Sequence, residues 1–190
     1  MNQAATGAGY FIIQTILTLF CLAVLLRFIL QAVRADFYNP LSQAIVKITE
    51  PVLKPIRMVL PTFGGLDIAA LLVALLLQMA LAMLLFTGLP AGSAAIVAPF
   101  RLLMLVFDVY FWALLIMVIL SWVSPGNRHP GAMLIHQITE PLLLPFRRLI
   151  PPVGGLDFSI LAVFILLMLV REFLVPGIAA EMGVPRQLLR

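Results

Sequence analysis

Four long apolar stretches dominate the chain, and shorter stretches of mixed polarity separate them. The apolar stretches cover residues about 10–33, 67–86, 96–123 and 157–175. Each is close to or longer than the roughly 20 residues that an α-helix needs to cross a hydrocarbon core. None alternates apolar and polar positions as the strands of a membrane barrel do. Because only helices and closed barrels satisfy their backbone in lipid, the pattern predicts an all-α membrane protein with four transmembrane helices.

One of the mixed stretches occurs twice. Residues 40–68 (the first block) and 130–158 (the second block) align without insertion, and 14 of the 29 aligned positions are identical. Both blocks keep the pattern I-T-E-P-x-L-x-P-x-R-x-x-x-P-x-x-G-G-L-D. We therefore expect two tandem units, residues 1–90 and 91–190, each a helical hairpin with a block between its two spans. Two spans per unit give both hairpins the same orientation, unlike the inverted repeats of many transporters.

Each block begins with an amphipathic segment. Apolar residues from Leu41 to Ile48 follow the i, i+3, i+4, i+7 spacing of a helix, which suits a helix lying in the membrane interface. Three prolines then follow within eleven residues in each block. Proline removes a helical hydrogen bond and disfavours helical backbone at the residue before it. We therefore expect the helix to stop at Glu50, and at Glu140 in the second block, and the remainder to be a bent surface or re-entrant segment.

A glutamate and an arginine recur at the same separation, as Glu50 with Arg57 and as Glu140 with Arg147. Two interpretations stay open. In the first, each arginine closes an ion pair, caps carbonyls that the prolines leave free, or extends to lipid phosphates. In the second, the two glutamates converge from the two units and bind a monovalent cation or a proton.

Aspartate stands at the start of two predicted spans and inside a third. Asp67 and Asp157 follow a Gly-Gly-Leu turn and precede apolar helices, where aspartate is a favoured N-cap; a direct functional role is the alternative. Asp108 lies inside the third span, where an ionisable group is costly and often functional. It either pairs with an arginine, Arg101 or Arg171, or handles protons or ions.

Basic residues gather around the two blocks. The chain has 12 Lys and Arg against 8 Asp and Glu. Seven of the 12 basic residues lie around the blocks, and none lies in the first nine residues or in the linker 87–95. The positive-inside rule then predicts cytoplasmic blocks and outward termini, although Arg186 and Arg190 near the C-terminus argue against it. Arg27, inside the first span, is expected to anchor the helix by extending to the cytoplasmic interface.

Composition narrows the classes of function. Hydrophobic residues make up 63% of the chain and charged residues 11%, whereas a soluble domain has about 25% charged residues. The first nine residues lack the basic residues of a secretory signal peptide, so we expect the first apolar stretch to be a permanent span that is not cleaved. His129 and His136 lack metal-site spacing, and Cys21 stands alone, so we expect no metal and no cofactor. No nucleophile elbow and no aromatic–basic alternation occurs, so we expect neither an enzyme nor a nucleic-acid partner.

The doubled pattern, with G-G-L-D before a span, resembles the YggT family of bacterial membrane proteins, which is related to YlmG and its plastid counterparts. The resemblance covers almost the whole chain. Lys54 is Leu144 in the second block, so no role rests on that cation. The motif positions are Glu50, Pro51, Pro55, Arg57, Gly64, Gly65 and Asp67, and Glu140, Pro141, Pro145, Arg147, Gly154, Gly155 and Asp157.

The resemblance implies a multi-pass protein of the bacterial inner membrane that supports osmotic-stress tolerance or ion homeostasis, as a small conduit or as a modifier of one. Relatives linked to cell division and membrane organisation keep a second hypothesis open, a scaffold for division or membrane-assembly proteins. The expected partners are membrane lipids, with a monovalent cation or proton under the first hypothesis and a cytoplasmic or membrane protein under the second. A homo-oligomer is compatible with both.

Overall fold

The computed structural model describes residues 2–123, 129–150 and 157–189. Its elements are α1 (Asn2–Ala32), α2 (Pro40–Arg57), α3 (Ile68–Leu85), α4 (Ala91–Val123), α5 (Pro130–Leu149), α6 (Phe158–Leu169), the π-helical segment η1 (Val170–Leu174), α7 (Val175–Glu181) and the 3-10 helix η2 (Arg186–Leu189). Apart from an isolated bridge between Phe63 and Leu66, the described residues contain no strand pairing. The prediction of an all-α protein is confirmed.

Four helical stretches are long and apolar enough to cross a membrane, as predicted. They are Gly7–Ala32, Ile68–Leu85, Ala91–Val123 and Phe158–Glu181. Two boundaries differ from the prediction. α4 begins inside the expected linker, because the small residues after Pro90 are compatible with a helix and the carbonyl of Pro90 accepts the first helical hydrogen bond from Ala94 at 2.9 Å. The last stretch continues past residue 175 through η1 and α7.

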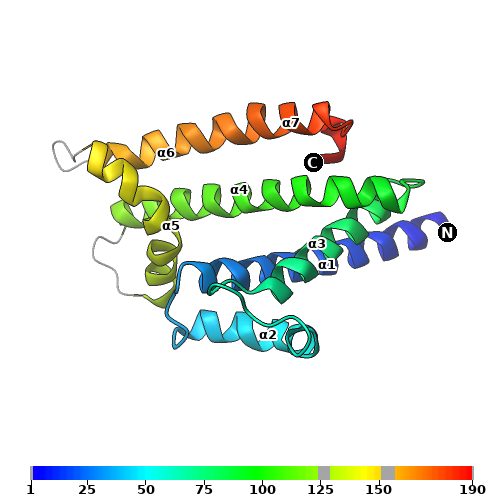
Figure 1. Cartoon of the computed structure of the whole chain (residues 1–190), viewed down its shortest axis with the longest axis horizontal. Helices are drawn as coiled ribbons and strands as arrows, with labels where there is room; N and C mark the ends of the chain where they lie inside the picture. Colours follow the sequence, from blue (N-terminus) through cyan, green and yellow to red (C-terminus); the bar gives the residue numbers. More distant parts are fainter. Residues whose placement is uncertain (1, 124–128, 151–156, 190) are drawn as a thin grey trace.

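The long helices lie side by side, with α4 at the centre. Figure 1 shows α1 and α3 on one side of α4 and the α6–α7 rod on the other. α2 lies along α1, whereas α5 crosses one end of α4. The two chain termini lie toward the opposite end of the molecule. The segments that follow the first and third spans both begin at the end opposite the termini, and α2 extends from there back along α1.

Apolar side chains fill the contacts between helices and also cover much of the outside. The largest cluster joins Val24 and Leu25 of α1 to Val73 of α3 and Leu134 of α5. Outward-facing residues of the spans are just as apolar; Phe11 is 68% exposed. An apolar exterior on helices of this length fits contact with lipid rather than water.

Each block forms one continuous helix over its first two prolines, so the expected stop at Glu50 and at its counterpart is wrong. α2 runs through Pro51 and Pro55, and α5 runs through Pro141 and Pro145. Prolines four residues apart lie on one helical face, and all four are exposed. Because this face is exposed, the surroundings can reach the backbone there and offset part of the cost of about 3 kcal/mol per proline.

The predicted apolar face of the first block is not its packed face. Leu41 and Ile48 are 46% and 59% exposed, whereas Thr49 is fully buried. In the second block the apolar face packs inside the protein, since Leu134 and Ile138 are buried. The two helices differ because α2 turns its polar side toward α1, where a buried arginine requires polar partners.

Candidate functional site

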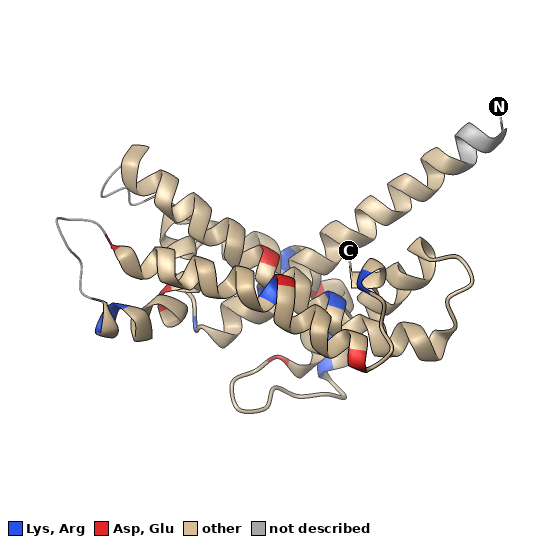
Figure 2. Cartoon of the chain, turned by 90° about the horizontal axis from the view of Figure 1, so that it is seen from above, with Lys and Arg blue, Asp and Glu red and all other residues tan. Residues whose placement is uncertain are grey.

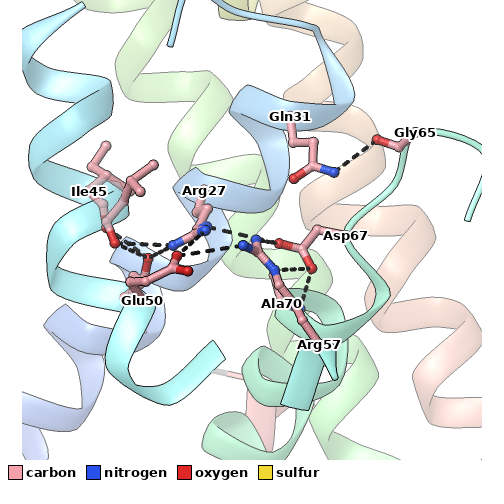
Figure 3. Close-up of polar contacts among 10 residues, drawn as sticks. Arg27, Gln31, Ile45, Glu50, Arg57, Gly65, Asp67 and Ala70 are labelled. Carbon is pink, nitrogen blue, oxygen red and sulfur yellow. Dashed lines mark hydrogen bonds and ion pairs between the residues drawn. The ribbon is translucent and has the colours of Figure 1, made fainter. Parts of the chain in front are cut away.

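Four charged side chains from three parts of the chain meet beside α1 (Figure 3). Arg27 comes from α1, Glu50 and Arg57 from α2, and Asp67 from the turn before α3. Arg27 Nη2 donates to Glu50 Oε2 at 2.6 Å, and its Nη1 donates to the Thr49 hydroxyl at 2.8 Å. We call these four charged residues the first network.

Arg57 closes the first network into a ring. Its Nη1 lies 3.6 Å from Glu50 Oε2, its Nε donates to Asp67 Oδ1 at 3.3 Å, and its Nη2 pairs with Oδ2 of the same carboxylate. Arg27 Nε lies 4.0 Å from Asp67 Oδ2. Each carboxylate therefore faces both guanidiniums, and two positive charges balance two negative ones. This balance matters because Arg27 is 4% exposed and Asp67 is fully buried, and an unpaired buried charge is strongly destabilising.

Asp67 joins this ring to the start of α3. It occupies the predicted N-cap position, and its Oδ1 accepts a hydrogen bond from the Ala70 N–H at 3.1 Å. Gly64 and Gly65 precede it with φ values of +61° and +85°. Such backbone angles favour glycine, so the Gly-Gly pair lets the chain turn sharply enough to bring Asp67 back against α2.

The second block forms a related but smaller network of Glu140, Arg147 and Asp157. Arg147 Nη1 donates to Glu140 Oε2 at 2.5 Å, and its Nε donates to Asp157 Oδ2 at 2.8 Å. Asp157 occupies the N-cap position of α6 and accepts from the Ser159 N–H at 3.0 Å. Burial disfavours the charged form of Asp157, but the hydrogen bonds from Arg147 and Ser159 and the charge of Arg147 outweigh it and lower the pKa of this carboxyl below its usual 3.8.

The position of Arg27 is occupied by Met117 in the second half of the chain. Thr139, which aligns with Thr49, donates its hydroxyl hydrogen to Met117 Sδ at 3.4 Å. The same pair of positions is therefore in contact in both halves, with an arginine in one and a thioether in the other. We call Glu140, Arg147 and Asp157 the second network.

The repeated glutamates thus engage arginines within their own halves. Glu50 contacts Arg27 and Arg57, and Glu140 contacts Arg147. The sequence left open whether each glutamate forms an ion pair with an arginine or whether the two glutamates converge on a cation. The contacts in the structure are ion pairs within each half.

A further set of charges lies within the spans, and Figure 2 shows charged positions gathered in the middle of the molecule. Asp108 stands near the midpoint of α4 and pairs with Arg171, whose Nη2 and Nε lie 2.7 and 2.9 Å from its Oδ1. Arg171 also pairs with Glu172, which Arg186 Nη2 contacts at 2.9 Å. Asp108 therefore has the partner on the fourth span that the sequence suggested.

The π-helical segment η1 positions this cluster. It carries Arg171 and Glu172 and is followed by Pro176, which has no N–H to donate to the Glu172 carbonyl four residues earlier. Arg186 Nη2 donates to that carbonyl at 3.0 Å. Short π segments inside α-helices are rare and frequently occur at functional sites.

A cavity of about 390 Å³ opens beside these charges. Its polar lining includes Asp108, Arg171, Glu172, Arg186, Arg101, Gln78 and Thr18. Arg101 has partners of its own on this lining, since its Nε donates to Gln78 Oε1 at 3.3 Å and its Nη1 donates to the Leu188 carbonyl at 3.0 Å. Carboxylates and guanidiniums therefore line one cavity between the membrane helices.

Arg27 and Arg186 are the site residues for which sequence reasoning expected other roles. Arg27 was expected to extend to the cytoplasmic interface, and the structure corrects this, because polar groups of α2 lie within reach and bury it. Arg27 is not repeated in the second half of the chain, where Met117 stands at the aligned position, so the internal repeat gives no sign of its role. The signal that could have found it is the rule that an intramembrane charge needs a partner.

Among the residues that the structure describes, no group of three or more His, Cys, Asp or Glu side chains could hold a metal ion. Cys21 is buried and accepts a weak hydrogen bond from Gln78 Nε2 at 3.6 Å.

Comparison with known proteins identifies the family. The sequence model of the CCB3/YggT family matches residues 6–88 and again residues 96–178, so each match contains one network. An uncharacterised protein of Pseudomonas aeruginosa is 46% identical over 187 residues, which cover 95% of each chain. A protein of Vibrio alginolyticus is 45% identical over 161 residues, 82% of this chain and 86% of the relative.

YggT of Escherichia coli K12 is 41% identical over 168 residues, which cover 85% of this chain and 86% of that protein. No solved structure matches the chain. Four apolar spans and bacterial relatives together indicate a multi-pass membrane protein of bacteria. With both halves matched and relatives aligned over most of their length, the chain belongs to the CCB3/YggT family.

Proposed function

We propose that this protein is a non-enzymatic component of the bacterial inner membrane that supports osmotic-stress tolerance or ion homeostasis by handling a monovalent cation or a proton. The observation that carries the proposal is the polar cavity of about 390 Å³ between the spans, with Asp108, Arg171 and Glu172 in its lining. Ionisable groups inside a membrane are costly, and they mark ion paths and proton relays.

The chemistry follows from the sharing of one guanidinium. Arg171 contacts both Asp108 and Glu172, and Glu172 has a second cation in Arg186. When Arg171 moves toward Glu172, Asp108 is left as a carboxylate facing the cavity. It then takes up a proton or a monovalent cation, and the return of Arg171 expels that charge.

The proposal places both blocks on the cytoplasmic side. The segments that follow the first and third spans begin at the same end of the molecule, which supports a common side for the two blocks. Seven of the 12 basic residues lie around the blocks, which supports the cytoplasm as that side.

Flux measurements test the proposal. We expect purified protein in liposomes to dissipate a potassium or proton gradient faster than empty liposomes. Asp108→Asn should lower this flux by about tenfold, which corresponds to about 1.4 kcal/mol in the barrier. Glu181→Gln is the matched control, because this exposed acid lies outside the cavity lining. Silent liposomes at high protein load, or equal flux in both variants, would contradict ion handling.

A second candidate function is a scaffold for cytoplasmic division or membrane-assembly proteins, and the apolar stripe on α2 favours it. Leu41, Ile48 and Val52 are 46%, 59% and 40% exposed on this helix. A photo-cross-linker at Ile48 in cells should capture a protein partner, whereas one at the buried Leu134 should not. Recovery of lipid alone from Ile48 would count against a scaffold.

A further inference from the structure

The two networks differ at one cation. In the first, Arg27 lies between Glu50 and Asp67, at 2.6 and 4.0 Å from their carboxylate oxygens. In the second, Met117 stands at the aligned position and contacts Thr139, as Arg27 contacts the aligned threonine. The helices that present this position are therefore arranged alike in both halves, while the second half has no guanidinium there.

The loss of that cation changes the charge balance. The second network has two carboxylates, Glu140 and Asp157, against one guanidinium, Arg147. Glu140 is as exposed as its counterpart Glu50, at 40% against 41%, but the Asp157 side chain is 26% exposed whereas the Asp67 side chain is fully buried. Among the described residues, one negative charge of the second network thus has no equivalent of the Arg27 counter-ion, and the partly exposed Asp157 can be reached by a ligand.

A cavity of about 730 Å³ adjoins this position. Asp157 and Arg147 form its charged end and Met117 lies in its wall, while Trp122 and Phe164 contribute to its mostly apolar remainder. Among the described residues that line it, Arg147 is the permanent cation, and His136 is the further basic group, able to carry a charge only when protonated. Glu140 lies behind this end, paired with Arg147, so the described residues of the network place two carboxylates and one guanidinium beside the cavity. An excess of negative charge beside an apolar wall fits an amphiphilic cation rather than a hydrated metal ion.

We propose that this cavity binds an organic cation with N–H donors and an apolar body. Its primary ammonium or guanidinium group takes the place that the Arg27 guanidinium has in the first network and donates hydrogen bonds to the carboxylates of Asp157 and Glu140. Its apolar body lies along Trp122 and Phe164. The same chemistry occurs in the ethanolamine headgroup of a phospholipid and in a soluble alkylguanidinium. The inference is independent of ion handling at Asp108.

Reconstituted full-length protein tests this site with two probes. The first probe is a mixed vesicle of ethanolamine and choline phospholipids, from which the protein is extracted and its retained lipid measured by native mass spectrometry. Choline has no N–H donor, so it is the matched lipid control. The second probe is octylguanidinium, added to the protein in a neutral detergent while the melting temperature is recorded.

Three variants complete the experiment. Met117→Arg places a guanidinium where Arg27 has one, Met117→Leu keeps the wall apolar, and Glu140→Gln removes one carboxylate without touching the N-cap of α6. We expect the wild type and Met117→Leu to bind alike. Met117→Arg and Glu140→Gln should weaken binding by about tenfold, the scale of one charge-assisted hydrogen bond.

The outcomes separate the two sources of the cation. Retention of ethanolamine over choline lipid assigns the site to a lipid headgroup. A higher melting temperature with octylguanidinium, without that lipid preference, assigns it to a soluble cation. Absence of both effects in the wild type overturns the proposal, as does equal binding by Met117→Arg and Met117→Leu. If Met117→Arg does not fold, undiminished binding by Glu140→Gln overturns it.

Discussion

At the scale of single residues, Arg27 lies deep in an apolar helix and yet contacts four groups of α2 and the adjoining turn. Its guanidinium donates to the Glu50 carboxylate, to the Thr49 hydroxyl and to the Val46 carbonyl, and it faces Asp67. The planar, multiply donating shape of arginine makes these contacts geometrically compatible in a way that lysine could not reproduce. The side chain therefore fastens α2 and the start of α3 to α1.

Replacing this arginine should destabilise the protein. Arg27→Met gives the first half the residue of the second and leaves Glu50 and the buried Asp67 with Arg57 as their remaining cation. We expect the free energy of unfolding to fall by about 3 kcal/mol, the scale for removing one member of a buried ion pair. Thermal unfolding in detergent measures this. Arg148→Met, at an exposed arginine of α5, is the control; equal melting temperatures for the two variants would refute the role of Arg27.

Asp157 gives a prediction for acid conditions. Its folded-state pKa lies below its usual 3.8, so ionised Asp157 stabilises the fold at pH values above 3.8. This contribution should be lost as the pH falls through the lower, folded-state pKa. Unfolding measured from neutral pH down to the acid range should show a smaller pH dependence for Asp157→Asn than for the wild type. Glu181→Gln, at an exposed acid, should keep the wild-type dependence.

At the scale of elements, the prolines of α2 and α5 lie inside helices. Pro51 and Pro55 share an exposed face, and so do Pro141 and Pro145. Tertiary contacts on the opposite face hold these helices together, because Leu53 and Leu143 are fully buried. The local cost of proline is therefore outweighed by packing that the sequence of the block alone does not reveal.

Removing such a proline should stabilise the helix. Pro51→Ala restores an N–H that can donate to the Lys47 carbonyl, and it relieves the steric conflict of the ring. We expect an increase in the free energy of unfolding of up to about 3 kcal/mol, measured by thermal unfolding. Pro141→Ala should act in the same direction in α5. A loss of stability in both variants would show instead that the prolines preserve a conformation other than a continuous helix.

The last span shows how a proline is accommodated differently. Pro176 has no N–H to donate to the Glu172 carbonyl, and the chain returns through η2 so that Arg186 donates to it. Arg186 had appeared in the sequence as a charge that argued against the predicted orientation. In the structure Arg186 pairs with Glu172, so it is weak evidence about which side of the membrane the C-terminus occupies.

At the scale of the whole molecule, the two halves repeat one pattern but pack it differently. α5 buries Leu134 and Ile138, whereas the aligned Ala44 and Ile48 of α2 are exposed. Leu134 and Ile138 belong to the cluster that includes Val24 and Leu25 of α1. The second block therefore helps to join the two halves, while the first block keeps an apolar surface for lipid or a partner.

A labelling experiment tests the sidedness of this arrangement. Single cysteines at the exposed positions Lys47, Leu144 and Thr87 are treated with a membrane-impermeant maleimide in intact cells and in inverted vesicles. We expect Lys47→Cys and Leu144→Cys to react in inverted vesicles, and Thr87→Cys to react in intact cells. The native Cys21 is buried and should stay silent as the internal control. Reaction of the two block positions from opposite sides would contradict the common side of the blocks.

The sequence by itself determined the four spans, the two charged motifs and the N-caps at Asp67 and Asp157. These features follow from local causes: apolar run length, the backbone freedom of glycine, and hydrogen bonds between residues close in the chain. Only the tertiary structure decided the partners of Arg27, the choice of Arg171 for Asp108, and the continuation of α2 and α5 through their prolines. Each of these depends on which groups from distant segments come within about 3–4 Å and on what burial then costs or stabilises, and no local pattern contains that information.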